Sequence, residues 1–175
     1  MKAIDLTLVA KAKEGDADSF AMLYEHIAPN LYRTALYTLG NAHDAEDVVS
    51  ETFMEAFHGI AKLRDDGAFA PWIYKILSAR CKRKIKEYIK GRNHFDIDSL
   101  LDLDDGKDLG DEVTQRSDLL HALEELTASE RQIIALVVIE GYTTKDTAKI
   151  LGLPHGTVSS KLFRTLKKLR ARLEE

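Results

Sequence analysis

The sequence is poor in cysteine and proline and contains no long apolar run. Its one cysteine, Cys81, cannot form an internal disulfide, which suits a reducing cytoplasm. No apolar stretch approaches membrane-spanning length, and the N-terminus lacks the hydrophobic core of a signal peptide. We therefore expect a cytoplasmic location without direct membrane insertion. Three prolines among 175 residues and a hydrophobic content of 45% favour a folded, helix-rich chain.

Residue patterns typical of enzymes are also missing. The six histidines and the single cysteine do not have the spacing of a zinc site. We find no phosphate-binding glycine loop and no Ser/His/Asp arrangement in a recognisable context. The expectation is a protein without catalytic residues, metal, cofactor or small-molecule substrate, which leaves functions based on binding.

A net charge of −4 argues against a nucleic-acid binder until its distribution is considered. Acidic residues concentrate in residues 92–112, where helical periodicity disappears, and this composition predicts a flexible linker. Cations concentrate on both sides of it. One group is the C-terminal helix, and the other is a basic block: Lys75, Arg80, Lys82, Arg83, Lys84, Lys86, Lys90 and Arg92.

Helical signals fill the N-terminal part. Asp5 and Asp16 can each cap a helix, and Pro29 is expected to break or kink the second one. A third helix over about residues 42–61 has an inner face that includes Phe53 and Phe57 and an acidic outer face. A fourth, from about 71 to 89, would bury Ile73, Leu77, Cys81, Ile85 and Tyr88 and present Lys75, Arg83, Lys86 and Lys90 on its other side.

The C-terminal part predicts a helix-turn-helix. A capping box, Thr127 to Glu130, opens a strongly apolar helix over residues 131–140, and Gly141 ends it. Thr143 can cap the next helix, Gly152 suits a left-handed turn, and Pro154 can begin the last helix. Its expected buried face is Val158, Leu162, Leu166 and Leu169, and its polar face is Thr157, Ser160, Lys161, Arg164 and Lys168. A helical hairpin with a merely solvated charged face is the alternative to DNA binding.

The predicted organisation is all-α, with two small helical domains, 1–91 and 113–175, joined by the acidic linker 92–112. The segments DAEDVVSETFMEAF, FAPWIYKIL and LTASERQIIALVVIEGYTTKDTAKILGLPHGTVSSKLFRTLKKLR occur in that order. Together they resemble a bacterial RNA polymerase sigma factor of the sigma-70 family, in particular the small extracytoplasmic-function (ECF) type that keeps regions 2 and 4. The resemblance covers almost the whole chain.

The resemblance implies partners and roles for matched positions. In such factors the third helix docks on the β′ clamp of core RNA polymerase, and the β flap is a further contact of the core enzyme; the matching docking residues are Asp44, Asp47, Ser50, Glu51 and Phe53. The loop 65–70 and the fourth helix correspond to the reader of the minus-ten element, which captures a flipped base. The last helix corresponds to the reader of the minus-thirty-five element, where Ser159, Ser160, Lys161 and Arg164 are candidates for contacts to bases or phosphates. An anti-sigma factor is a further expected partner.

For the minus-ten reader the candidate DNA-binding residues are aromatic or basic: Phe69, Trp72, Lys75, Arg80, Arg83 and Lys86. Phe69, Trp72 and Tyr74 could stack on unpaired bases, although a core role for Trp72 is an equal alternative. Aligned on Trp72, many relatives carry Asn and Asp where this chain has Ala79 and Arg83. This departure would shift binding toward backbone contacts.

The function predicted from the resemblance is an alternative sigma factor that directs promoter recognition and transcription initiation. A free-standing repressor or activator with the same helix-turn-helix is the alternative. It would dimerise and bind an operator without polymerase, and the acidic face of the third helix would then be only a solvated surface.

Overall fold

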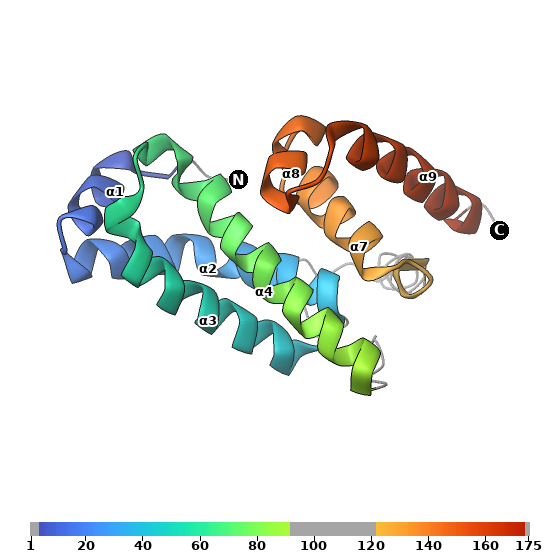
Figure 1. The fold of residues 1–175 in the computed structure, drawn as a ribbon, viewed down its shortest axis with the longest axis horizontal. Coiled ribbons are helices and arrows are strands. Elements are labelled where there is room, and N and C mark those ends of the chain that lie inside the picture. The colour runs from blue at the N-terminus through green and yellow to red at the C-terminus, as the bar shows by residue number, and fades with distance from the viewer. Residues whose placement is uncertain (1–3, 92–121, 174–175) are drawn as a thin grey trace, which may run out of the picture.

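The computed structural model describes residues 4–91 and 122–173, and every regular element within them is a helix, which confirms the all-α class. The N-terminal unit packs α1 (Leu6–Lys13), α2 (Ala17–Leu39), α3 (Ala42–Gly59) and α4 (Phe69–Gly91) around an apolar core that continues into the C-terminal unit (Figure 1). Asp5 and Asp16 cap α1 and α2 as predicted, because each carboxylate accepts a hydrogen bond from a backbone N–H of the first turn.

Of the break or kink predicted at Pro29, the break does not occur: α2 is helical from Ala17 to Leu39. A proline inside a helix removes one main-chain hydrogen bond and costs about 3 kcal/mol. Leu23 and Ile27 before it, and Leu31 and Ala35 after it, are all almost fully buried. Burial of each of the Leu and Ile side chains stabilises by about 1.5–3 kcal/mol, so packing on both sides of Pro29 outweighs its cost.

Two short 3₁₀ helices, η1 (Ile60–Lys62) and η2 (Asp66–Ala68), connect α3 to α4. The inner faces of α3 and α4 agree with the sequence pattern, with one exception on α3. Phe57 is 54% exposed, so its expected inward position is wrong, although its ring contacts Phe20 at 5.1 Å between centroids. It lies at the edge of the core, where an aromatic side chain can cover Phe20 and still meet solvent.

The C-terminal unit contains α7 (Ala128–Ile134), the π-helical segment η3 (Ala135–Ile139), α8 (Thr144–Leu151) and α9 (His155–Leu173). The predicted capping box is present: the Thr127 side chain accepts from Glu130 N, and the Glu130 carboxylate accepts from Thr127 N. The apolar side chains of this helix are not all buried. Ile133 and Leu136 are fully buried, but Val138 is 57% exposed.

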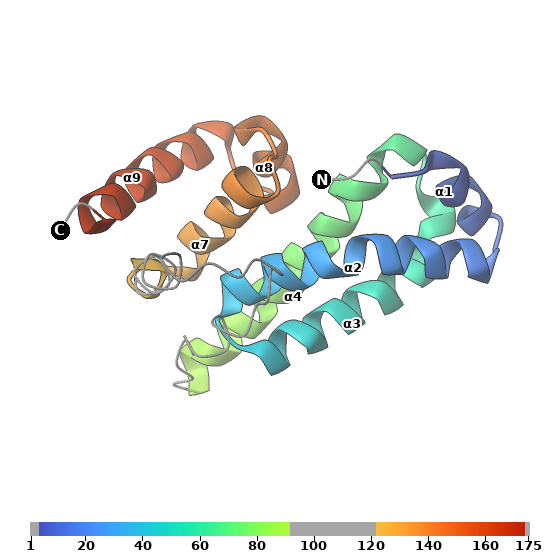
Figure 2. The same ribbon diagram turned by 180° about the vertical axis from the view of Figure 1, so that it is seen from behind.

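The two units lie against each other rather than apart: α2 contacts α7 and η3, and α4 contacts α8 (Figures 1 and 2). The predicted acidic linker, 92–112, lies outside the described residues. No helix in the described part of the chain is long and apolar enough to cross a membrane.

Candidate nucleic-acid and polymerase interface

The helix-turn-helix forms as the sequence predicts. Thr143 caps α8, its hydroxyl accepting from Asp146 N at 3.1 Å. Gly152 ends α8 with φ of +64°, a left-handed conformation that strains any residue with a Cβ. The first turn of α9 bonds back to Pro154, whose carbonyl accepts from Thr157 N at 3.0 Å.

The exposed side of α9 carries part of the predicted polar face. Ser160 and Arg164 are exposed one turn apart, and Arg164 Nε donates to the Ser160 carbonyl at 3.2 Å. Thr157 and Ser159 are half-buried in the first turn, and Ser159 Oγ lies 3.3 Å from His155 Nε2. Hydroxyl, guanidinium and imidazole groups therefore gather at the N-terminal half of the helix, which is the half that reaches base edges in this motif.

Two predicted DNA contacts point elsewhere in this structure. Lys161 Nζ donates to Ser129 Oγ at 3.0 Å, and Lys168 Nζ pairs with Glu130 at 2.9 Å. Burial raises the pKa of Glu130, but hydrogen bonds from Lys168 and Thr127 outweigh burial and hold that pKa at about 2. Both lysines thus brace α9 against the start of α7, whereas Arg164 does not.

The buried face of α9 differs from the prediction at one position. Val158, Thr165 and Leu169 are buried and Leu162 is half-buried, whereas Leu166 is 44% exposed. Seven residues make nearly two turns of an α-helix, so Thr165 lies above Val158 and Leu166 is rotated by about 80°. The apolar side chain of Leu166 predicts burial, but the helical rotation turns this position toward solvent and places Thr165 inside.

Sequence reasoning missed three exposed residues on α9. Phe163 is 72% exposed, and together with Leu166 and Lys167 it lines a shallow groove of about 540 Å³. His155 stands at the first position of the helix and contacts Thr144 Oγ1 at 2.9 Å. The spacing of Ser160, Arg164 and Lys167 at steps of four and three could have indicated Lys167.

On α4 the cations divide into exposed and paired groups. Lys75, Arg83 and Lys86 are exposed, as is Ala79 between them. Arg80 instead pairs with Glu51 at 2.8 Å and with Glu55 at 2.6 Å across the α3–α4 contact. The candidate strand-binding surface of α4 is therefore narrower than the basic block suggests.

The aromatic residues at the start of α4 are mainly core residues. Phe69 is 1% exposed and Tyr74 is fully buried, so neither ring can stack on a base in this conformation. Trp72 is half-buried beside Gly59, where an added Cβ would lie 3.3 Å from its ring. Trp72 is thus the member of this group that keeps an accessible surface.

The acidic face of α3 is partly neutralised by α4. Asp44 is 16% exposed and pairs with Lys84 at 2.9 Å, and it also accepts a hydrogen bond from the Tyr88 hydroxyl. Burial raises the pKa of Asp44, but these hydrogen bonds and the charge of Lys84 lower that pKa by more, so the net shift is downward. Asp47 and Glu51 remain about 44% and 40% exposed, and Ser50 is exposed, whereas Phe53 is buried at 6%.

Within residues 4–91 and 122–173, no group of three or more His, Cys, Asp or Glu could hold a metal ion. What the geometry offers is a basic, polar helix in a helix-turn-helix, a second cationic helix, and an acidic helix face. All three are suited to macromolecular partners.

Two family models match different parts of the chain. Sigma-70 region 2 matches residues 23–90, and Sigma-70, region 4 matches residues 116–169. The ECF RNA polymerase sigma factor SigM of Mycobacterium tuberculosis is 28% identical over 172 residues, covering 97% of this chain and 82% of SigM. SigW of Bacillus subtilis, also an ECF RNA polymerase sigma factor, is 26% identical and covers 95% of each chain.

Solved structures share the fold. The structure of CnrH in complex with the cytosolic domain of CnrY aligns with a TM-score of 0.68 at 24% identity, covering 97% of both chains. The sigma factor RpoE of Bartonella quintana, in complex with the anti-sigma factor NepR, aligns with a TM-score of 0.71 at 22% identity, covering 90% of this chain and 98% of RpoE. With regions 2 and 4 in order and similarity to ECF factors over nearly its whole length, this chain belongs to the sigma-70 family of RNA polymerase sigma factors, in its extracytoplasmic-function group.

Proposed function

We propose that this chain is an alternative sigma factor that binds core RNA polymerase and directs it to a restricted set of promoters. The observation that carries the proposal is the presence of both regions in one chain, each with the expected helical geometry. A free-standing repressor would need only the helix-turn-helix and would leave region 2 without a role. The chain itself acts without catalytic residues, in the cytoplasm, and the polymerase performs the phosphoryl transfer.

In this proposal residues 1–91 dock on the polymerase and open the duplex. The half-exposed carboxylates of Asp47 and Glu51, with Ser50 beside them, offer an acidic surface to a basic β′ clamp. Lys75, Arg83 and Lys86 on α4 track the separated strand, while Trp72 stacks on a base. Since Ala79 and Arg83 replace Asn and Asp, we infer that phosphate contacts carry more of the binding here.

Residues 113–175 read the minus-thirty-five element through the first half of α9. Ser160 and Arg164 are the residues whose exposure and position best suit base contacts in the major groove. Arg and Lys side chains nearby, including Lys167, contact phosphates and set the register. An anti-sigma factor is a further proposed partner, because both similar solved sigma-factor structures hold a bound protein partner and one of these is named as an anti-sigma factor.

Reconstitution tests the function directly. The purified chain is added to core enzyme, and run-off transcription is measured on a library of genomic fragments, with core enzyme alone as the control. We expect co-purification with core and transcripts from a small set of templates. A chain that does not bind core enzyme but binds palindromic duplex DNA by itself would establish the repressor alternative instead.

A further inference from the structure

The carboxylate of Glu140 is buried between the two units. It lies at the end of η3, followed by Gly141 with φ of +76°, and its side chain is only 1% exposed. It belongs to the C-terminal unit, yet four donors of the N-terminal unit surround it. They are Tyr74 Oη at 2.9 Å, Asn30 Nδ2 at 3.3 Å, Arg33 Nη2 at 3.3 Å and Thr34 Oγ1 at 3.4 Å.

This arrangement favours one docked geometry over others. A buried carboxylate is costly unless hydrogen bonds and an opposite charge compensate for the lost hydration. Here every one of the four donors comes from α2 or α4, so the compensation exists only while the units are together. Burial next to the Glu140 carboxylate raises the pKa of Tyr74 above its usual range, which keeps its hydroxyl a donor.

Two further contacts cross the same boundary. Lys82 Nζ on α4 donates a hydrogen bond to the Leu151 carbonyl oxygen, 2.5 Å away. Leu151 is the last residue of α8, and a cation is favourable at the C-terminal end of a helix. Arg131 on α7 donates Nε to the Thr38 carbonyl of α2 at 3.1 Å. The helix-turn-helix is thus held against the helix proposed to open the duplex.

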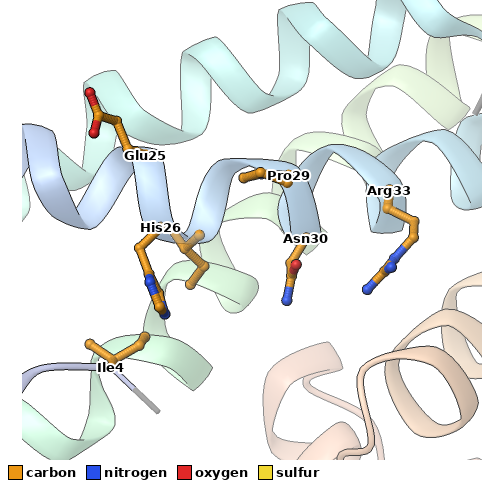
Figure 3. A pocket seen from close by; sticks show the side chains of 7 residues that line it. Ile4, Glu25, His26, Pro29, Asn30 and Arg33 are labelled. Atoms are coloured by element: carbon orange, nitrogen blue, oxygen red, sulfur yellow. The ribbon is translucent and has the colours of Figure 1, made fainter. Parts of the chain in front are cut away.

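The edge of the contact on α2 remains open to water. A pocket of about 490 Å³ lies beside it, and Asn30 and Arg33 point from α2 toward the C-terminal unit at its rim (Figure 3). The side chain of Arg33 is 32% exposed. Water can therefore compete for these donors, which is what a contact that opens reversibly requires.

The closed arrangement cannot serve both promoter elements at once. Elements about 25 base pairs apart are separated by roughly 85 Å of B-form duplex at 3.4 Å per pair. In this structure α8 contacts α4, and α9, with 19 residues, is only about 28 Å long. The units must separate before the two readers can bind their elements together.

We propose that Glu140, inserted between Asn30, Arg33, Thr34 and Tyr74, is an autoinhibitory latch that holds the free chain closed. The proposal rests on the proposed function for what closure inhibits. The latch lowers the apparent affinity for any partner that needs the separated units, in proportion to the small fraction of chains that are open. Binding of core polymerase would supply the free energy that separates them.

The test uses fluorescence transfer within the free chain. Met22→Cys on α2 and Arg170→Cys on α9 place dyes on exposed positions of the two units. Cys81 can stay, because it is buried and burial raises the pKa of its thiol to about 12, so it reacts slowly. In this background Glu140→Ala is compared with Glu125→Gln, an exposed glutamate that pairs with Arg172 inside the C-terminal unit.

We expect Glu140→Ala to lower the transfer efficiency at unchanged helix content by circular dichroism, and Glu125→Gln to leave it unchanged. Tyr74→Phe removes one hydrogen-bond donor to Glu140 from the N-terminal unit. This variant should lower the transfer efficiency by a smaller amount. If Glu140→Ala loses helix content, the transfer efficiencies of Tyr74→Phe and Asn30→Ala, each lacking one donor to Glu140, test the latch instead. An efficiency equal to that of the wild-type chain in folded variants would overturn the latch, whether or not the chain binds polymerase.

The inhibitory role has its own readout. With core enzyme in excess and the chain limiting, Glu140→Ala should raise the initial rate of run-off transcription by five-fold or more, and both chains should reach the same yield at saturation. A rate equal to that of the wild-type chain would overturn the inhibitory role. No transcript from either chain would instead count against the proposed sigma function, and the fluorescence result would stand by itself.

Discussion

Lys84 on α4 forms an ion pair of 2.9 Å with Asp44 on α3, so part of the acidic face proposed to meet polymerase is already neutralised within the fold. Asp44 is the least exposed of these acids and also accepts from Tyr88. Asp47 and Glu51 keep much larger exposed fractions. Asp44 therefore positions α3 on α4, while Asp47 and Glu51 are the carboxylates that a partner can reach.

Charge reversal at Asp47 and Glu51 should separate docking from folding. We expect the double substitution to lysine to weaken binding to core polymerase at least ten-fold, because it replaces an attractive surface with a repulsive one. Stability should fall by no more than about 1 kcal/mol per site, since exposed ion pairs contribute little. Affinity is measured by titration of labelled chain with core enzyme, and stability by urea unfolding.

Arg80→Ala is the matched control for that experiment. It removes the ion pairs of Arg80 with Glu51 and Glu55 and keeps every carboxylate of the acidic face. A similar small loss of stability with unchanged affinity for core is expected. Loss of affinity in Arg80→Ala equal to that of the reversal would show that helix packing, not surface charge, governs docking.

Glu130 should make stability depend on acid pH. Its pKa is about 2 in the folded chain against an ordinary value of 4.5, so its contribution is complete above about 4.5 and is lost as the pH falls toward 2. The contribution is at most about 3 kcal/mol. Glu130→Gln should therefore be less stable than the wild-type chain at pH 6, and the difference should disappear near pH 2. Urea unfolding at a series of pH values measures it, and a pH-independent difference would contradict this cause.

Thr165 offers a stabilising substitution. Its side chain is fully buried, and its hydroxyl has no hydrogen-bond partner among the described residues. Thr165→Val replaces that hydroxyl by a methyl group of similar size and should stabilise the chain by about 1 kcal/mol. Thr165→Ser, which keeps the hydroxyl and loses the methyl, should destabilise it by a similar amount. Thermal unfolding of both variants checks the pair, and a destabilised Thr165→Val would reveal a hidden partner for the hydroxyl.

Local signals in the sequence predicted the elements well, because caps and turns act over a few residues. Asp5, Asp16 and Thr143 cap helices, and Gly152 takes the left-handed conformation that its position suggested. The continuous helix through Pro29 was not predictable in this way, since it depends on packing against other helices. Helix propensity describes an isolated helix, whereas burial of the residues on both sides of Pro29 decides whether α2 continues through it.

The candidate site was predicted less completely for the same reason. A run of cations does not reveal which members are paired across helices, and Arg80 and Lys168 are held by Glu51, Glu55 and Glu130 from elsewhere in the chain. Glu140 is the extreme case. In the sequence it is one acid before a glycine, and its four donors lie 66 to 110 residues away.

Arg164 provides the sharpest test of the reader helix. Its guanidinium is exposed, and within the described part of the chain Arg164 Nε donates to the carbonyl oxygen of Ser160 in its own helix at 3.2 Å. If it makes a good contact to a base, Arg164→Ala in the holoenzyme should cost about 1–3 kcal/mol on the preferred promoter and relax selectivity at one position. Promoter binding is measured on duplexes with single base changes, with Arg172→Ala at the far end of α9 as the matched control. Equal weakening on every duplex would assign Arg164 to phosphate, because a backbone contact carries no sequence information.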